Sequence, residues 1–175
     1  KEKQIKAFDV MKDQFGYANR LAAPKLEKVV VSVGTGKRSR FDRTVNDMIA
    51  ERLAKITGQK PAKRGAKQSI ATFKIRTGDP VGQVVTLRGK RMHAFLDKLI
   101  DIALPRTKDF RGIKRTAVDD MGNLTIGIKE HTIFPETSDE ELKNVFGLAV
   151  TVVTTADNKE EATKFFELIG VPFVK

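Results

Sequence analysis

Basic side chains gather in one stretch of the chain, in a pattern suited to binding a polyanion. From Arg52 to Gly78 the sequence has eight Lys or Arg residues and no Asp or Glu. The middle of this stretch, Gly58 to Ser69, is rich in Gly, Pro and Ala, so it cannot bury itself in a core. We expect a strand-flanked basic loop exposed to solvent. A solvated charge run usually mixes signs, so the unmixed run favours contact with nucleic acid.

A second candidate for phosphate binding is Gly34-Thr35-Gly36-Lys37, between a predicted strand and a predicted helix. Its spacing matches neither a P-loop nor a dinucleotide-binding fingerprint. The favoured interpretation is an ordinary strand-to-helix turn. Lys37, Arg38 and Arg40 are then candidates for contact with RNA phosphates rather than with a nucleotide.

Catalytic and metal chemistry have little support in the sequence. The chain has no Cys, and its two histidines, His93 and His131, are far apart, so no metal or other cofactor is expected. We expect both histidines at the surface or at a helix edge. Asp119 with Asp120 fits a turn, and the acidic run Asp139–Glu141 fits a helix cap, so we favour structural roles over acid-base chemistry for both.

Two aromatic residues lie among charged neighbours, where a ring could stack on a base. Phe41 also fits the apolar stripe of a predicted helix, which favours the core. For Phe110, stacking and anchoring of its loop are left equally open.

The elements that would position these residues follow from apolar periodicity and from Gly and Pro breaks. The pattern predicts an α+β fold: a two-layer sandwich in which helices cover one face of a mostly antiparallel sheet that carries a long basic loop. Predicted helices span residues 2–15, 41–56, 90–100 and 157–169, with a short one between Ser138 and Gly147. Predicted strands span residues 26–33, 71–76, 81–88, 124–128 and 148–155, the second and third forming a hairpin.

Length and charge limit the possible classes of protein. The 175 residues suit a single domain, residues 1–175, and no apolar run approaches a membrane span or a signal peptide, so we expect a soluble protein. Residues 1–115 hold 28 Lys or Arg against 11 Asp or Glu, whereas residues 116–175 hold 5 against 11. This asymmetry predicts one face for a polyanion and another for water or a basic partner.

Several long strings resemble one family. They are PKLEKVVVSVGTG from Pro24, ITGQKPAKRGAKQSIATFKIRTGDPVG from Ile56, VTLRGKRMHAFLDKLIDIALPRTKDFRG from Val85, GNLTIGIKEHTIFPE from Gly122 and VTTADNKEEATKFFELIGVPF from Val153. These strings are similar to the bacterial type of the large-subunit ribosomal protein L five, over nearly the whole chain from Phe15 onward. The resemblance implies a non-enzymatic, cytoplasmic protein of the ribosome.

The resemblance also implies partners. A member of this family would bind 5S rRNA and anchor it in the central protuberance beside neighbouring 5S-binding proteins of the large subunit. It would contact 23S rRNA and P-site tRNA and bridge to the small-subunit ribosomal protein S thirteen. Neither a membrane nor a small-molecule substrate is expected.

The positions that match the family's motifs are the candidate site residues. For 5S rRNA these centre on Ser32, where the family usually has Asn, with Gln59 and Thr86, and extend to Lys28, Lys60, Gln68, Ser69 and Arg88. The loop from Lys60 to Ile75 corresponds to the part that reaches toward tRNA, and the candidates for contact with tRNA or other RNA are Lys37, Arg38, Arg40, Lys63, Arg64, Lys67, Lys74 and Arg76. The bridge side would include Arg106, Lys108, Phe110, Arg111 and Phe134. Asp120-Met121-Gly122 departs from the family's usual Asp-Gly-Arg-Gly turn and so lacks one basic contact.

Two rival functions fit the residues less well. An enzyme acting on phosphate esters or nucleotides would use Gly34–Lys37 and the Asp clusters, but it lacks a convergent nucleophile, base and metal set. A stand-alone basic RNA chaperone would bind unrelated RNAs as well as 5S rRNA.

Overall fold

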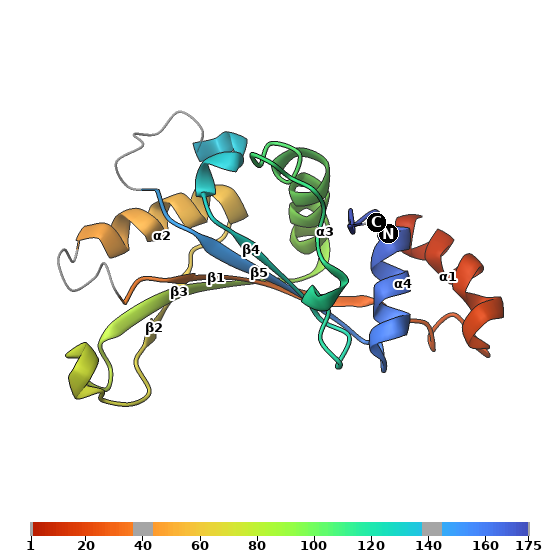
Figure 1. Ribbon diagram of the computed structural model, residues 1–175, viewed down its shortest axis with the longest axis horizontal. Helices are drawn as coiled ribbons and strands as arrows, with labels where there is room; N and C mark the ends of the chain where they lie inside the picture. The colour runs from red at the N-terminus through yellow and green to blue at the C-terminus, as the bar shows by residue number, and fades with distance from the viewer. Residues whose placement is uncertain (1, 37–43, 138–144, 175) are drawn as a thin grey trace. The chain divides into compact units, whose positions relative to one another are not determined.

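The computed structural model describes residues 2–36, 44–137 and 145–174, with the backbone alone for residues 2–6. In this part of the chain, five strands form one sheet in the order β2-β3-β1-β5-β4 (Figure 1). The chain divides into two compact units. The first comprises residues 1–29, 88–126 and 150–175, and the second comprises residues 30–87 and 127–149. The expectation of a single domain stays a prediction.

The second unit is built on β1 (Leu26–Gly34), β3 (Pro80–Leu87) and β2 (Ala62–Gly65). The backbone N–H of Thr35 donates to the carbonyl of Val81 at 2.9 Å, so the end of β1 lies beside the start of β3 and the two strands are antiparallel. In both strands every second residue is buried, for example Val31 in β1 and Val85 in β3. The intervening residues of each strand are half-exposed, such as Ser32 and Thr86. One face of this part of the sheet is therefore packed and the other is open.

Helix α2 (Thr44–Thr57) packs on the covered face of the second unit. Ile49, Leu53 and Ile56 recur at helical spacing, and all three are buried. The helix ends where Gly58 takes a positive φ of 67°, a conformation that glycine adopts without strain. This confirms the predicted helix, although Ser39 to Arg43 lie outside the described residues.

The first unit packs α3 (Gly89–Lys98) and α4 (Lys159–Ile169) with β4 (Leu124–Ile128) and β5 (Leu148–Thr154). After α3 the helix continues through one π-helical turn, Leu99–Ala103, in which the N–H of Leu104 donates to the carbonyl of Leu99 at 2.9 Å. Apolar side chains from all these elements meet in one core, including Leu96, Leu99, Leu124, Val152, Phe166 and Ile169.

Helix α1 (Glu2–Phe15) packs against α4, with Met11 buried between them. The hydroxyl of Tyr17, just after α1, donates to the carboxylate of Glu161. The other oxygen of Glu161 accepts the backbone N–H of Asp157 at 2.9 Å, just before α4. Burial, reinforced by the hydrogen bond to the Glu161 carboxylate, raises the pKa of Tyr17 well above its usual range.

One predicted strand is wrong. Residues 71–76 alternate like a half-buried strand, yet the structure has a 3-10 turn at Ala71–Phe73, followed by Lys74 at a positive φ of 49°. No sheet face covers this segment, so the alternating side chains have nothing to pack against, and the strand paired with β3 is β2. β2 was missed because none of its four residues is buried, which removes the apolar signal.

The remaining elements agree with the α+β prediction. The first and last helices, β1, β4 and β5 lie where expected, within two residues at their ends. The predicted short helix begins in residues 138–144, which lie outside the described part of the chain. Two 3-10 turns, His131–Ile133 and Pro135–Thr137, come just before it.

Candidate nucleic-acid interface

A protruding hairpin, residues 60–79, carries most of the candidate RNA-binding cations, and we name it the basic arm. At its base β2 pairs with β3 in antiparallel register, Ala62 opposite Val84 and Arg64 opposite Gly82, with an irregularity after Arg64. Farther out, the N–H of Ala66 donates to the carbonyl of Asp79 at 2.8 Å. These backbone bonds extend the hairpin beyond the sheet, as Figure 1 shows.

The tip of the basic arm is closed by hydrogen bonds between its two sides. Ile70 and Ile75 exchange both backbone bonds, at 3.0 and 3.3 Å. The hydroxyl of Ser69 accepts the backbone N–H of Thr77 at 3.0 Å and lies 3.1 Å from the Thr77 hydroxyl. No residue from 60 to 79 is buried. The arm is therefore ordered by its backbone and by short polar side chains, not by a core of its own.

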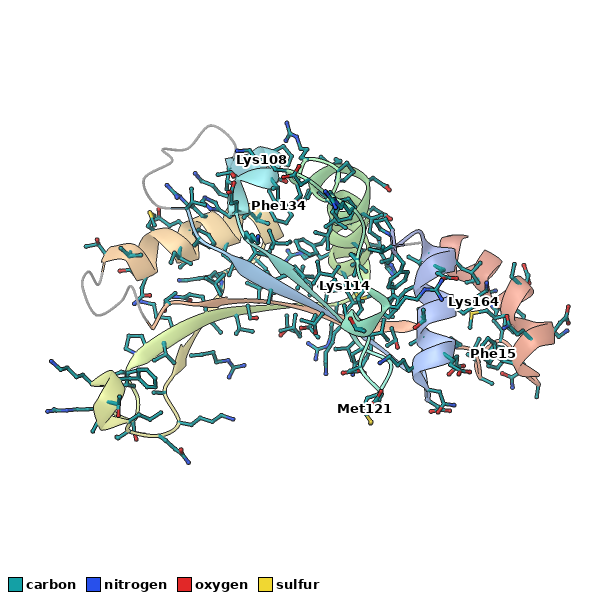
Figure 2. All side chains as sticks on the ribbon, in the orientation of Figure 1. Phe15, Lys108, Lys114, Met121, Phe134 and Lys164 are labelled. Carbon is teal, nitrogen blue, oxygen red and sulfur yellow. The ribbon has the colours of Figure 1, made fainter. Side chains whose placement is uncertain are left out.

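The charged side chains of the arm point into solvent (Figure 2). Lys63 forms an ion pair with Asp47 of α2, at 2.9 Å between Nζ and Oδ1, and both side chains are exposed. An exposed pair of this kind contributes little to stability, so a phosphate can replace the carboxylate at small cost. Among the described residues, the other cations of the arm have no carboxylate partner; they are Lys60, Arg64, Lys67, Lys74 and Arg76.

The open sheet face of the second unit brings three predicted contact residues together at the base of the arm. Ser32 of β1 and Thr86 of β3 lie on this face of neighbouring strands, and both are half-exposed. Gln59, just before the arm, donates from Nε2 to the backbone carbonyl of Thr86 at 3.2 Å. Residues far apart in the sequence thus form one polar patch, which we name the open-face patch: Ser32, Gln59 and Thr86.

The other predicted 5S contacts lie on several elements of the two units. Gln68 is exposed on the arm, and the Ser69 hydroxyl is already engaged by Thr77. Lys28 and Arg88 belong to the first unit, where Lys28 lies 3.5 Å from Glu27 and Arg88 is exposed just before α3. Lys37, Arg38 and Arg40 lie outside the described residues.

One cation of the acid-free stretch is not available to RNA. Arg52 is buried in the second unit, where its guanidinium lies 3.3 Å from Nε2 of His131. His131 is only 1% exposed and stacks on Phe146 with ring centroids 4.1 Å apart. The expectation that His131 lies at the surface or a helix edge is therefore wrong. A polar pair of this kind gives no periodic signal in the sequence, so only the tertiary structure identifies it.

The predicted bridge side is corrected at one residue. Arg106, Lys108 and Arg111 are exposed and Phe110 is half-buried, so all four can offer side-chain surface to a partner. Phe134 is 0% exposed. Phe134, labelled in Figure 2, is a core residue of the second unit, so its side chain cannot contact a partner protein.

The carboxylate pair at Asp119 has the structural role predicted for it. Asp119 accepts the backbone N–H of Asn123 at 2.7 Å and its side-chain amide at 3.1 Å, which fixes the turn before β4. Asp120 lies 3.6 Å from the ammonium of Lys159. In the described part of the chain, no three His, Asp or Glu side chains group in a way that could hold a metal ion.

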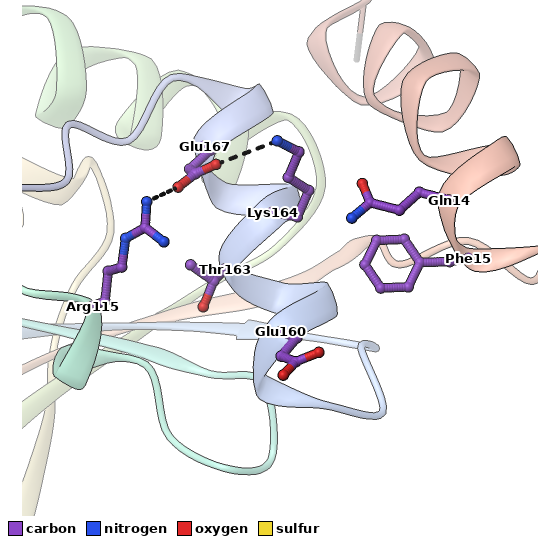
Figure 3. Close-up of a pocket in the computed structure, with 7 residues that line it drawn as sticks. All are labelled: Gln14, Phe15, Arg115, Glu160, Thr163, Lys164 and Glu167. Carbon is purple, nitrogen blue, oxygen red and sulfur yellow. Dashed lines mark hydrogen bonds and ion pairs between the residues drawn. The ribbon is translucent and has the colours of Figure 1, made fainter. Parts of the chain in front are cut away.

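A groove in the first unit lies between the end of α1, Arg115 and α4 (Figure 3). Its cations are paired, because Glu167 contacts Arg115 at 2.8 Å and Lys164 at 3.6 Å. The hydroxyl of Thr163 donates to the backbone of its own helix at 2.7 Å. The lining therefore offers no nucleophile with an adjacent base.

Among the helices that the structure describes, none is long and apolar enough to cross a membrane.

Comparison with known proteins identifies the family. The family model described as "Ribosomal protein L5" matches residues 19–76, and the model for the C-terminus of the same ribosomal family matches residues 80–173. The chain is 48% identical to the large ribosomal subunit protein uL5 of Natranaerobius thermophilus over 163 residues, which cover 93% of this chain and 90% of that protein. It is 46% identical to the uL5 of Anaeromyxobacter sp. strain K over 172 residues, covering 98% and 94%. The uL5 of Rubrobacter xylanophilus is 49% identical over 163 residues, covering 93% of this chain and 90% of that protein. The chain therefore belongs to the ribosomal protein L5 family, whose members are structural proteins of the large ribosomal subunit and not enzymes.

Proposed function

We propose that the chain binds 5S rRNA through the open-face patch and anchors that RNA in the central protuberance of the large subunit. The observation that carries the proposal is that Ser32 and Thr86 lie half-exposed on the same face of neighbouring strands, while Gln59 donates to the carbonyl of Thr86. Hydroxyl and amide groups of this kind suit the sugars and base edges of an irregular RNA. Lys60, exposed next to Gln59, supplies a cation for a neighbouring phosphate.

The basic arm and the loop after α3 would then serve other contacts of the same particle. We assign P-site tRNA and 23S rRNA to the arm, because its cations are exposed and its backbone holds them away from the core. We assign the bridge to small-subunit protein S thirteen to the exposed residues Arg106, Lys108 and Arg111, with Phe110. Neighbouring 5S-binding proteins complete the set of partners, and the chain acts at the ribosome, in the cytoplasm of a bacterial cell.

The 5S proposal is tested by binding of the full chain to 5S rRNA across a salt series. Thr86→Ala removes one hydroxyl from the open-face patch and should weaken binding about 2- to 10-fold, the range of one hydrogen bond, with no change in the salt slope. Thr163→Ala is the matched control, because that hydroxyl bonds to its own helix in the first unit. Equal effects of the two substitutions would contradict the proposal.

A gain-of-contact variant tests the same patch from the other direction. The family usually has Asn where this chain has Ser32, and the longer amide reaches farther from the sheet. Ser32→Asn should therefore strengthen 5S binding, by a few-fold for one added hydrogen bond. Weaker binding by Ser32→Asn in a protein of unchanged melting temperature would show that the patch does not face the RNA as proposed.

A further inference from the structure

Two large apolar side chains stand exposed at the tip of the basic arm. Ile70 is 44% exposed and Phe73 is 54% exposed. Among the described residues of the second unit, no other large apolar side chain is exposed. The expected contact residues of the arm are all polar or basic, so these two are not explained by attraction to phosphates.

The backbone holds both side chains in fixed places. Ile70 is tied to Ile75 across the arm, and the N–H of Phe73 donates back to the carbonyl of Ile70 at 3.2 Å. The next residue, Lys74, takes the left-handed conformation at φ 49° and turns the chain back, with its N–H donating to the carbonyl of Ala71 at 2.9 Å. Ile70 therefore lies just before the 3-10 turn and Phe73 is its last residue, so the backbone holds the two residues close together.

Cations surround this apolar tip. Lys74 follows Phe73 directly, Arg76 is three residues beyond it, and Lys67 is three residues before Ile70. All three are exposed, and the nearest acid in sequence, Asp79, accepts the backbone N–H of Arg76 at 2.8 Å. An aromatic ring and an aliphatic side chain among cations suit a base face with its phosphates alongside.

We propose that Ile70 and Phe73 form a base-contacting tip, with Phe73 stacking on an unpaired nucleotide of an RNA loop while Lys67, Lys74 and Arg76 contact its phosphates. This inference rests on the proposed function, since it names the kind of RNA structure that the arm would recognise. An RNA duplex keeps its base faces stacked inside the helix, so an apolar tip gains nothing there. The preferred ligand is therefore a hairpin loop or a bulge.

The charge of the arm favours RNA over a protein as the occupant of the tip. A protein that covered Ile70 and Phe73 would also have to cover the exposed cations around them, at the cost of removing their water unless it carried matching carboxylates. RNA supplies phosphates at the spacing of its own nucleotides, and its unpaired bases supply the apolar face.

The experiment measures binding of the full chain to two RNA probes across a salt series. One probe is a hairpin with a loop of unpaired nucleotides, and the other is the same stem as a continuous duplex. Phe73→Ala should weaken binding to the hairpin about 5- to 100-fold, the range for loss of one base–aromatic stack, and leave the duplex unaffected. Phe73→Tyr keeps an aromatic ring and should bind the hairpin as tightly as wild type does. Lys67→Ala should weaken both complexes and lower the salt slope.

Several results would overturn the inference. Equal binding of the hairpin by wild type and Phe73→Ala would show that Phe73 makes no stacking contact with the RNA. An equal loss for hairpin and duplex would show that the tip does not select unpaired bases. In a third outcome, Phe73→Ala binds both RNA probes as wild type does and yet fails to attach to purified ribosomal subunits stripped of tRNA. That result would assign the tip to a protein partner. Each of these leaves the 5S proposal standing if Thr86→Ala still weakens 5S binding, whereas a neutral Thr86→Ala with a sensitive Phe73→Ala would contradict only the open-face patch.

Discussion

Arg52 and His131 lie in contact in the interior of the second unit, and the burial of Arg52 changes what the acid-free stretch can do. The ring of His131 is fixed from several sides. It stacks on Phe146, and its Nδ1 accepts the backbone N–H of Phe146 at 3.3 Å. Its own carbonyl accepts the hydroxyl of Thr137 at 2.9 Å. His131 thus contacts Arg52 of α2, Phe146 and the residue that ends the second 3-10 turn.

Replacement of this histidine should cost much of the protein's stability. His131→Ala leaves a cavity beside Phe146 and removes a buried partner of Arg52, so we expect a loss of about 2–4 kcal/mol in the free energy of unfolding. Urea unfolding followed by circular dichroism measures the loss. Lys129→Ala, an exposed change two residues away, should stay within about 0.5 kcal/mol of wild type. A comparably small effect of His131→Ala would show that the buried contact contributes little.

Tyr17 offers a spectroscopic test of the contact between the end of α1 and α4. It is the only tyrosine in a chain without tryptophan, so the absorbance of ionised phenol reports on this residue alone. Because burial and the Glu161 carboxylate raise its pKa, phenol ionisation in the folded protein should lie above pH 10, the ordinary value for tyrosine. Glu161→Gln removes the negative charge and should move the ionisation back toward that value.

The sign of the linked stability effect follows from the direction of this pKa shift. The folded state favours the neutral phenol, so its contribution is fully present below about pH 10 and is lost as the pH rises above it, where the unfolded chain ionises first. Tyr17→Phe should therefore show a shallower loss of stability than wild type above pH 10. Parallel curves for the two proteins would contradict the assigned contact.

At the scale of the elements, the turn before β4 depends on a glycine. Gly122 has a positive φ of 75°, and a Cβ at this position would lie 3.0 Å from the side chain and the carbonyl of Ala156. Its carbonyl accepts the hydroxyl of Thr154 at 2.7 Å, which joins the turn to the end of β5. The turn has room for no side chain at this point.

A pair of glycine substitutions separates backbone strain from crowding. Gly16 after α1 has a similar φ of 68°, but a Cβ there would meet nothing within 4 Å. Gly16→Ala should cost about 1 kcal/mol from the left-handed backbone alone, and Gly122→Ala about 3 kcal/mol because crowding is added. Thermal unfolding of both variants measures the difference. Equal losses would mean that the turn shifts away from Ala156 without cost.

The elements also show which structural signals the sequence carries and which it lacks. The spacing of apolar residues predicted α2, β1 and β5, because an element that packs on a core has apolar residues at its own period. The same rule failed at residues 71–76, where alternation occurs without any sheet to cover one side. For the candidate interface, composition alone indicated the polyanion, and only the family resemblance indicated Ser32 and Thr86. The convergence of Gln59 on Thr86 depends on strand pairing over long sequence distances, which no local pattern records.

At the scale of the whole chain, charge is distributed unevenly along the sequence, and this should dominate RNA affinity. Each phosphate neutralised by Lys or Arg releases condensed counterions, so the logarithm of the 5S binding constant should fall linearly with the logarithm of salt concentration. Lys60→Ala should lower that slope by about 0.7–0.9 if the side chain contacts one phosphate of 5S rRNA. Filter binding from low to moderate salt provides the measurement.

A charge-matched variant provides the control. Lys164→Ala removes the same charge from the acidic last third of the chain, where Lys164 already contacts Glu167. Its slope should equal that of wild type. A flat salt dependence for the wild-type protein, or the same change of slope in both variants, would contradict an electrostatic role of the basic arm.

The absence of buried side chains in the basic arm has an evolutionary consequence. Backbone bonds hold residues 66–79 together, so folding asks little of their side chains except at the turn glycines and at the Ser69–Thr77 contact. Selection on these positions should therefore reflect the partner alone. Saturation mutagenesis of the arm should leave protein abundance unchanged at most positions while ribosome assembly or translation changes, whereas the same substitutions in α2 should lower abundance first.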